Sequence, residues 1–108
     1  MDIFGKVLAV TPRDPFTTSD GRSIYATDVV ISVPECRLSQ MGGIYLKGRV
    51  FQCTLMSESA NTSAPEVGRF VCAEISVNAS YSQEKTMWFN RITLNKWVDM
   101  ANVNWAWQ

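Results

Sequence analysis

A strict two-residue alternation over residues 71–81 limits the folds that this chain can adopt. Mostly polar side chains occupy one set of alternating positions, and apolar ones occupy the other: Val71, Ala73, Ile75, Val77 and Ala79. A period of two is that of a β-strand with one face on a core and the other in solvent. The polar residues 82–85 predict a turn, and residues 86–98 predict the returning strand of a hairpin.

The returning strand carries aromatic residues beside cations. Trp88 is in phase with Ile92 and Leu94, so we expect these three side chains in the core. Phe89 is in phase with Arg91 on the alternate face, so we expect both to point outward. Aromatic rings next to cations occur in cores, at sheet edges and on nucleic-acid surfaces, and the choice among these is the functional question.

Three earlier segments have the composition of strands, at residues 3–10, 24–33 and 49–57. In the second of them Tyr25 shares a face with Val29 and Ile31. Gly5 lies inside the first of them, where a glycine indicates a bulge or the close approach of another backbone.

The segment between the second and third strands is the hardest to predict. Pro34 is expected to end the second strand. Residues 35–48 include Gly42 and Gly43 and are compatible with a helical turn before the glycines or with an elaborated hairpin. We expect this segment to be irregular.

Five strands with no long helix and with long loops at residues 11–23 and 58–66 predict an all-β protein. A chain of 108 residues, 46% hydrophobic and 19% charged, fits one globular domain over residues 1–108 with a C-terminal extension at 99–108. An immunoglobulin-like sandwich would need about seven strands. The pattern therefore favours the five-stranded Greek-key barrel of the OB-fold, with long loops and little helix.

The cysteines and the N-terminal residues indicate the cellular compartment in which we expect the protein. No apolar run approaches the ~20 residues that span a bilayer, and the N-terminal residues do not resemble a signal peptide, so we expect a cytoplasmic protein without a membrane partner. Cys36, Cys53 and Cys72 are odd in number and lack metal-type spacing. Cys53 and Cys72 lie in apolar strand patterns and are expected to be buried thiols. We expect no disulfide scaffold, metal or cofactor.

The residue types argue against catalysis. The chain has no histidine, which removes the commonest general base and metal ligand. No serine lies in a Gly-x-Ser-x-Gly pattern, no phosphate-binding glycine loop is present, and the acidic residues are dispersed. We therefore expect a binding protein and not an enzyme.

Single-strand binders combine a groove of Lys and Arg with aromatic rings on which bases stack. In an OB-fold the binding regions are the strand 2–3 face and the loops joining strands 1–2 and 4–5. Ten basic and ten acidic residues give a net charge of zero, so any basic surface must be local. The candidate nucleic-acid-binding residues are Arg13, Phe16, Arg22, Tyr25, Arg49, Gln52, Thr54, Tyr81, Lys85, Phe89 and Arg91.

Three short motifs carry a family resemblance: Gly5-Lys6-Val7 with Val10, Val67-Gly68 with Val71, and residues 88–92 leading to Trp97. Together they resemble an uncharacterised group of small bacterial and phage-type OB-fold proteins related to single-stranded DNA-binding proteins. The resemblance covers most of the chain and implies an OB-fold that binds single-stranded DNA. The chain departs from that pattern at residues 35–48. Its tail also lacks the acidic, Pro-Phe-ended tip through which typical single-strand binders recruit partners.

A second hypothesis is a protein–protein or assembly module. Edge strands are templates for pairing with another chain, and exposed tryptophan is a common interface anchor. In the tail, Val103, Trp105 and Trp107 alternate. Homo-oligomers could therefore form through an edge strand or through residues 99–108.

Overall fold

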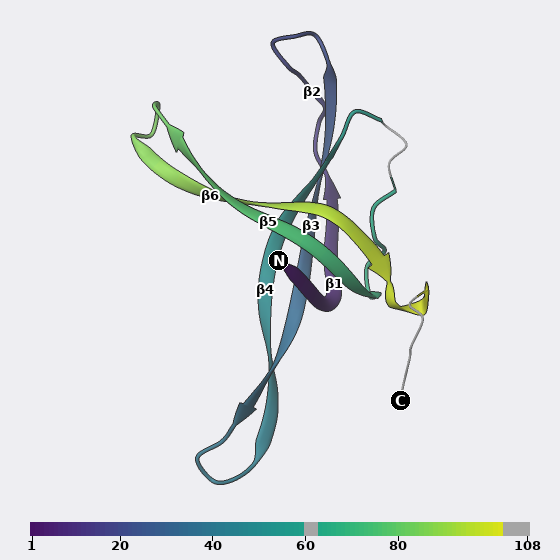
Figure 1. The fold of residues 1–108 in the computed structure, drawn as a ribbon, viewed down its shortest axis with the longest axis vertical. Coiled ribbons are helices and arrows are strands. Elements are labelled where there is room, and N and C mark those ends of the chain that lie inside the picture. The colour runs from purple at the N-terminus through teal and green to yellow at the C-terminus, as the bar shows by residue number, and fades with distance from the viewer. Residues whose placement is uncertain (60–62, 103–108) are drawn as a thin grey trace.

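The computed structural model describes residues 1–59 and 63–102 of the chain (Figure 1). Six strands and one short 3₁₀ turn follow one another along the chain. They are β1 (Asp2–Pro12), β2 (Phe16–Thr17), β3 (Ser23–Leu38), β4 (Ile44–Ser57), β5 (Phe70–Ser82), β6 (Met87–Asp99) and η1 (Met100–Asn102).

The five long strands close into a barrel. Their order is β1-β5-β6-β4-β3, and β3 pairs back onto β1. All of these pairings are antiparallel except that of β4 with β6, which is parallel and is held at the single register pair Thr54–Thr93. The two-residue strand β2 is attached to the start of β3. The protein is therefore an all-β barrel of the OB type, as the sequence predicts.

Strand β1 closes the barrel by pairing with β5 along its first half and with β3 along its second half. Residues 2–6 pair with β5, residues 6–12 pair with β3, and a register shift falls between Val7 and Ala9. At Gly5 a Cβ atom would collide with the backbone carbonyl oxygen of Ser32 and would lie 2.7 Å from Cγ2 of Ile31. Only glycine lets the two backbones approach this closely, which confirms the prediction for a glycine inside this strand.

One apolar cluster fills the barrel, with side chains from all five long strands. Its buried members are Ile3, Val7, Val29, Ile31, Cys53, Val71, Ala73, Ile75 and Leu94. Ile92 and Trp97 pack against this cluster from β6. The core positions predicted for Leu94 and Ile92 are thus confirmed.

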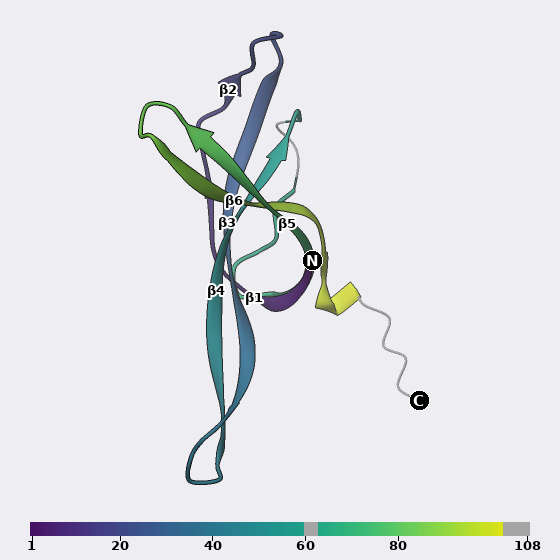
Figure 2. The same cartoon turned by 60° about the vertical axis from the view of Figure 1, so that its left-hand side comes forward.

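Two hairpins extend beyond this core in different directions (Figures 1 and 2). The radius of gyration is 16.9 Å, whereas a compact domain of this length would have about 13 Å. One projection is the end of the β3–β4 hairpin, where Pro34 pairs with Gly48 and the ladder continues to Leu38 and Ile44. The predictions that Pro34 ends the strand and that residues 35–48 are irregular are therefore wrong, and the elaborated hairpin is the correct alternative.

The other projection is the tip of the β5–β6 hairpin. Val77 and Trp88 are 53% and 68% exposed, because the alternating face of this hairpin continues after the barrel core has ended. The core position predicted for Trp88 is wrong for this reason. Cys53 is buried as predicted, and burial raises the pKa of its thiol. Cys72 is exposed, against the prediction, because it lies on the outer face of β5.

Within the described residues no helix has the length and apolar character needed to span a bilayer. The alternation predicted for Val103, Trp105 and Trp107 lies outside the described residues.

Candidate nucleic-acid interface

A groove of about 750 Å³ lies where the β1–β3 loop and the outer face of β4 meet the β5–β6 hairpin. We call it the aromatic groove. Its lining residues are Arg13, Phe16, Ala26, Gln52, Thr54, Met56, Ser80, Tyr81, Ser82, Lys85, Phe89, Asn90, Arg91 and Ile92.

The β1–β3 loop supplies one wall of the aromatic groove. Phe16 lies in β2 and pairs with Ile24 at the start of β3. The backbone N–H of Arg13 donates to the carbonyl of Ala26 at 2.9 Å, and that of Thr18 donates to Arg22 at 2.8 Å. These bonds fix the loop at both ends of β2, although the Phe16 side chain is 49% exposed. A large apolar ring is therefore held in place without being buried.

The β5–β6 hairpin supplies the opposite wall and two more aromatic rings. Tyr81 and Trp88 are register partners, and their ring centroids lie 5.3 Å apart at an interplanar angle of 52°. Nζ of Lys85, in the turn, lies 5.5 Å from the ring centroid of Phe89, within the range of a cation–π interaction. Both lining rings, Tyr81 and Phe89, remain exposed to solvent.

The charge on the lining residues is positive. Arg13, Lys85 and Arg91 line the groove, and neither Asp nor Glu is among the described residues of its lining. Nε of Arg13 lies 2.7 Å from Oδ2 of Asp28, and this carboxylate raises the pKa of the arginine. Lys85 and Arg91 form no ion pair with any residue that the structure describes. Two of the ten cations therefore present uncompensated charge to the groove.

Elsewhere most cations are neutralised locally. Arg22, Arg37, Arg49, Arg69 and Lys96 each lie within 4.0 Å of a carboxylate. The zero net charge of the chain thus hides an uneven distribution, in which acids neutralise cations outside the groove more completely than inside it.

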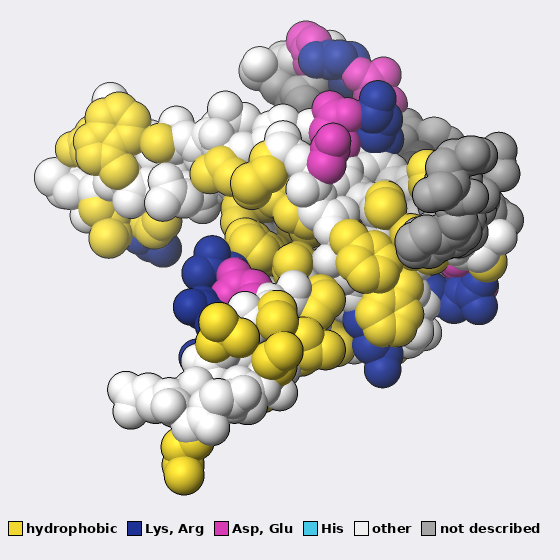
Figure 3. Space-filling view, turned by 60° about the horizontal axis from the view of Figure 1, so that its bottom comes forward, with side chains coloured by type: hydrophobic (Ala, Val, Ile, Leu, Met, Phe, Trp, Pro, Cys, Tyr) yellow, Lys and Arg dark blue, Asp and Glu magenta, His cyan; other side chains and the backbone are white. Residues whose placement is uncertain are grey.

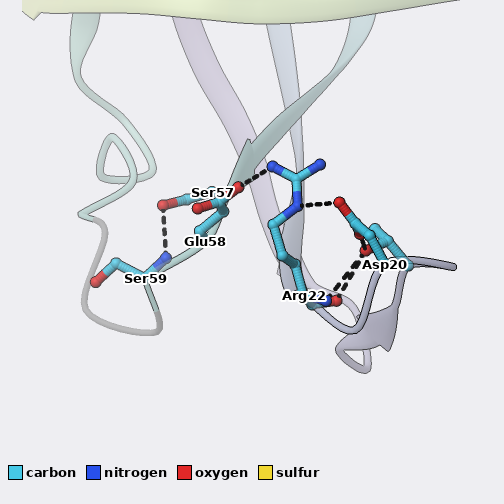
Figure 4. A network of polar contacts seen from close by, with 6 residues as sticks. Asp20, Arg22, Ser57, Glu58 and Ser59 are labelled. Carbon is cyan, nitrogen blue, oxygen red and sulfur yellow. Dashed lines mark hydrogen bonds and ion pairs between the residues drawn. The ribbon is translucent and has the colours of Figure 1, made fainter.

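The structure brings most of the predicted site residues together. Those that line the aromatic groove are Arg13, Phe16, Gln52, Thr54, Tyr81, Lys85, Phe89 and Arg91. The other three lie outside its lining. Tyr25 is half-buried on β3, and Arg49 is paired with Glu35 at 3.1 Å. Arg22 is held between Asp20 at 2.9 Å and Glu58 at 2.5 Å (Figure 4).

Sequence reasoning missed three polar lining residues. Ser80, Ser82 and Asn90 line the groove beside Tyr81 and Phe89. Their amide and hydroxyl groups can donate and accept hydrogen bonds. The signal was present, because each is the immediate neighbour of a predicted aromatic residue at a hairpin tip, where both faces are accessible.

Among residues 1–59 and 63–102 no cluster of three or more His, Cys, Asp or Glu side chains could hold a metal ion. No protein-family model matches the chain, and no curated protein is significantly similar to it. The geometry of the groove is therefore the basis on which a function can be proposed.

Proposed function

We propose that the aromatic groove binds single-stranded DNA. In this proposal Phe16, Tyr81 and Phe89 provide surfaces on which unpaired bases stack, and Lys85 and Arg91 contact phosphates. Gln52 and Asn90 offer amide groups to base edges. The protein acts as a non-catalytic binding module.

One observation carries the proposal: a chain of zero net charge places three exposed aromatic rings and three cations around one groove, and no carboxylate is among the described residues that line it. Single exposed aromatic rings are common on protein surfaces, but several gathered in one groove mark an interaction site. Folding does not require cations to gather beside them. Stacking contributes roughly 1–3 kcal/mol per base, so three rings would be the main source of affinity.

The same residues favour a single strand over a duplex. An aromatic side chain can stack on a base only where that base has left the stack of a double helix. Duplex binders rely chiefly on many phosphate contacts, and the described residues that line the groove include three cations. We therefore expect binding that depends on aromatic rings more than on charge.

The test is fluorescence anisotropy of a labelled oligo-dT titrated with the protein at low salt. We expect Phe89→Ala and Tyr81→Ala to weaken binding by roughly 5- to 150-fold each, the equivalent of one lost stack. Both side chains are exposed, so the variants should fold normally. The matched control is Tyr45→Ala, which removes an exposed tyrosine from the far end of the β3–β4 hairpin. Equal losses for all three variants, or no binding by the unmodified protein, would refute the proposal.

A further inference from the structure

The projecting end of the β3–β4 hairpin has two chemically different faces. We call this segment, residues 34–48, the arm. Residues directly opposite each other in an antiparallel pair share a face. Cys36 lies opposite Leu46 and Leu38 opposite Ile44, which makes one face apolar.

The alternate register pairs form a charged face. Glu35 lies opposite Lys47 and Arg37 opposite Tyr45. An oxygen of Glu35 lies 2.7 Å from a guanidinium nitrogen of Arg37, and its other oxygen lies 3.1 Å from Nε of Arg49 at the base of the arm. Figure 3, in which this end of the molecule comes forward, shows hydrophobic side chains gathered beside a charged cluster.

The apolar face of the arm does not belong to the barrel core. The β3–β4 ladder runs from Tyr25 to Leu38 without an irregularity, so the alternation can be followed along its whole length. In the barrel the odd-numbered Val29 and Ile31 of β3 are buried. Along the paired segments of the arm the odd-numbered positions hold the charged residues and Tyr45, and the large apolar residues lie at even-numbered positions. The pattern therefore inverts, and the apolar face of the arm continues the outer surface of the barrel.

This face is left uncovered by the part of the chain that the structure describes. Leu38, Ile44 and Leu46 are 79%, 70% and 73% exposed, and Met41 at the tip is 96% exposed. A two-stranded ribbon is marginally stable in water unless its apolar face packs against something. Contiguous exposed apolar patches also mark interaction sites. An amphipathic arm outside the core therefore indicates an external partner.

We infer that the partner is a second copy of this chain, with the apolar faces of two arms packed against each other about a two-fold axis. In such an interface the patch faces its own copy, so a patch with charges of one sign would face the same sign on its partner. The apolar face carries none, which makes it self-compatible and unsuited to a phosphate backbone. The inference concerns a different surface from the aromatic groove and does not depend on the proposed function.

The size of the patch supports this assignment. Burying one large aliphatic side chain removes roughly 60–120 Å² from water, from the usual free energy per side chain and per unit area. The four exposed side chains of the arm, with Cys36 and the exposed Val50 that follows it in phase, offer on the order of 500 Å² per protomer. Two copies would bury about 1,000 Å², the lower limit of a specific interface. We therefore expect a dimer of moderate affinity.

The test is sedimentation velocity of the full-length protein, without DNA, over a wide concentration range. We expect a monomer–dimer equilibrium that Leu46→Glu weakens by at least about 30-fold, as for a central interface residue. The neighbouring Tyr45→Glu is the matched control, because it places the same charge on the opposite face across from Arg37. This control should leave the dissociation constant unchanged. Leu46 is exposed, so the circular dichroism spectrum and thermal midpoint of its variant should match those of the unmodified protein.

Three results would overturn the inference. One is a monomer at all concentrations, and another is a dimer that Leu46→Glu does not weaken. The third is a monomer that binds phosphatidylcholine vesicles and loses that binding in Leu46→Glu, which would assign the arm to a lipid surface.

Discussion

Replacing Asp28 with asparagine should turn Arg13 into a third DNA-binding cation. Nε of Arg13 donates to Oδ2 of Asp28 at 2.7 Å, so the charge of the arginine is compensated at the edge of the groove. Asparagine removes the opposing charge but keeps an oxygen that can accept the hydrogen bond that Thr54 donates to Asp28 at 3.3 Å. The fold should therefore be preserved while the groove gains one unit of available positive charge.

The expected magnitude follows from the number of uncompensated cations. For single strands the logarithm of the binding constant falls with the logarithm of salt concentration by about 0.7 per neutralised phosphate. With Lys85 and Arg91 available, we expect a slope of about −1.4. Asp28→Asn should make the slope about −2.1 and tighten binding at low salt, whereas Lys85→Ala should reduce it to about −0.7.

The assay is anisotropy of one labelled oligo-dT at several sodium chloride concentrations. Glu58→Gln is the control, because it changes the net charge equally but loosens Arg22, which lies outside the lining of the groove. The slope for this variant should stay at about −1.4. Equal slopes for Asp28→Asn and Glu58→Gln would refute the reasoning, since net charge and not the groove would then set the affinity.

Three further predictions concern the barrel. Gly5→Ala should lower the free energy of unfolding in urea by about 1–3 kcal/mol, because the new methyl group meets the Ser32 carbonyl; an unchanged midpoint would contradict this. Hydrogen bonds from Arg69 and a backbone N–H hold the pKa of Asp99 below its usual range. The ionised Asp99 carboxylate therefore stabilises the fold above about pH 4, and this contribution is lost as the pH falls through the lowered pKa. Asp99→Asn should consequently flatten the acid side of a plot of unfolding free energy against pH. An Ellman titration of the native protein, at a concentration that keeps it monomeric, should modify Cys36 and Cys72 and leave Cys53 unmodified until denaturant is added, since Cys53 is buried.

The barrel itself could be predicted from the sequence because its strands obey the period-two rule wherever both the core and the solvent are present. Ile75 and Leu94 follow that rule and are buried. The close backbone approach at Gly5 could be predicted as well, because a glycine inside a strand usually marks a bulge or such an approach.

The continuous pairing of the arm could not be predicted, because a proline ends a central strand but is tolerated in a strand that has a free edge. Beyond Ser32, strand β3 is paired with β4 alone. A residue without an N–H is tolerated at such an edge, so Pro34 interrupts nothing. The alternation also does not show how far a two-stranded ribbon extends beyond the core, because an exposed apolar face and a buried one have the same pattern.

Trp88 shows the same limit at the other hairpin. Trp88 shares the face of Leu94, but phase identifies a face of the strand and not how far the core extends along it. The aromatic groove could be predicted in composition, since residues near the ends of OB-fold strands and loops supply it. Which cations remain uncompensated could not be predicted, because ion pairs such as Arg22–Glu58 join residues far apart in the sequence.

The most direct test of the proposed DNA-binding groove is a ¹⁵N–¹H NMR titration of the protein with unlabelled oligo-dT. We expect the amide shifts to gather at Phe16, at Gln52 and Thr54, and along residues 80–91, and the shifts of the arm at residues 34–48 to stay unchanged. Shifts confined to the arm, or no shifts at saturating DNA, would contradict it.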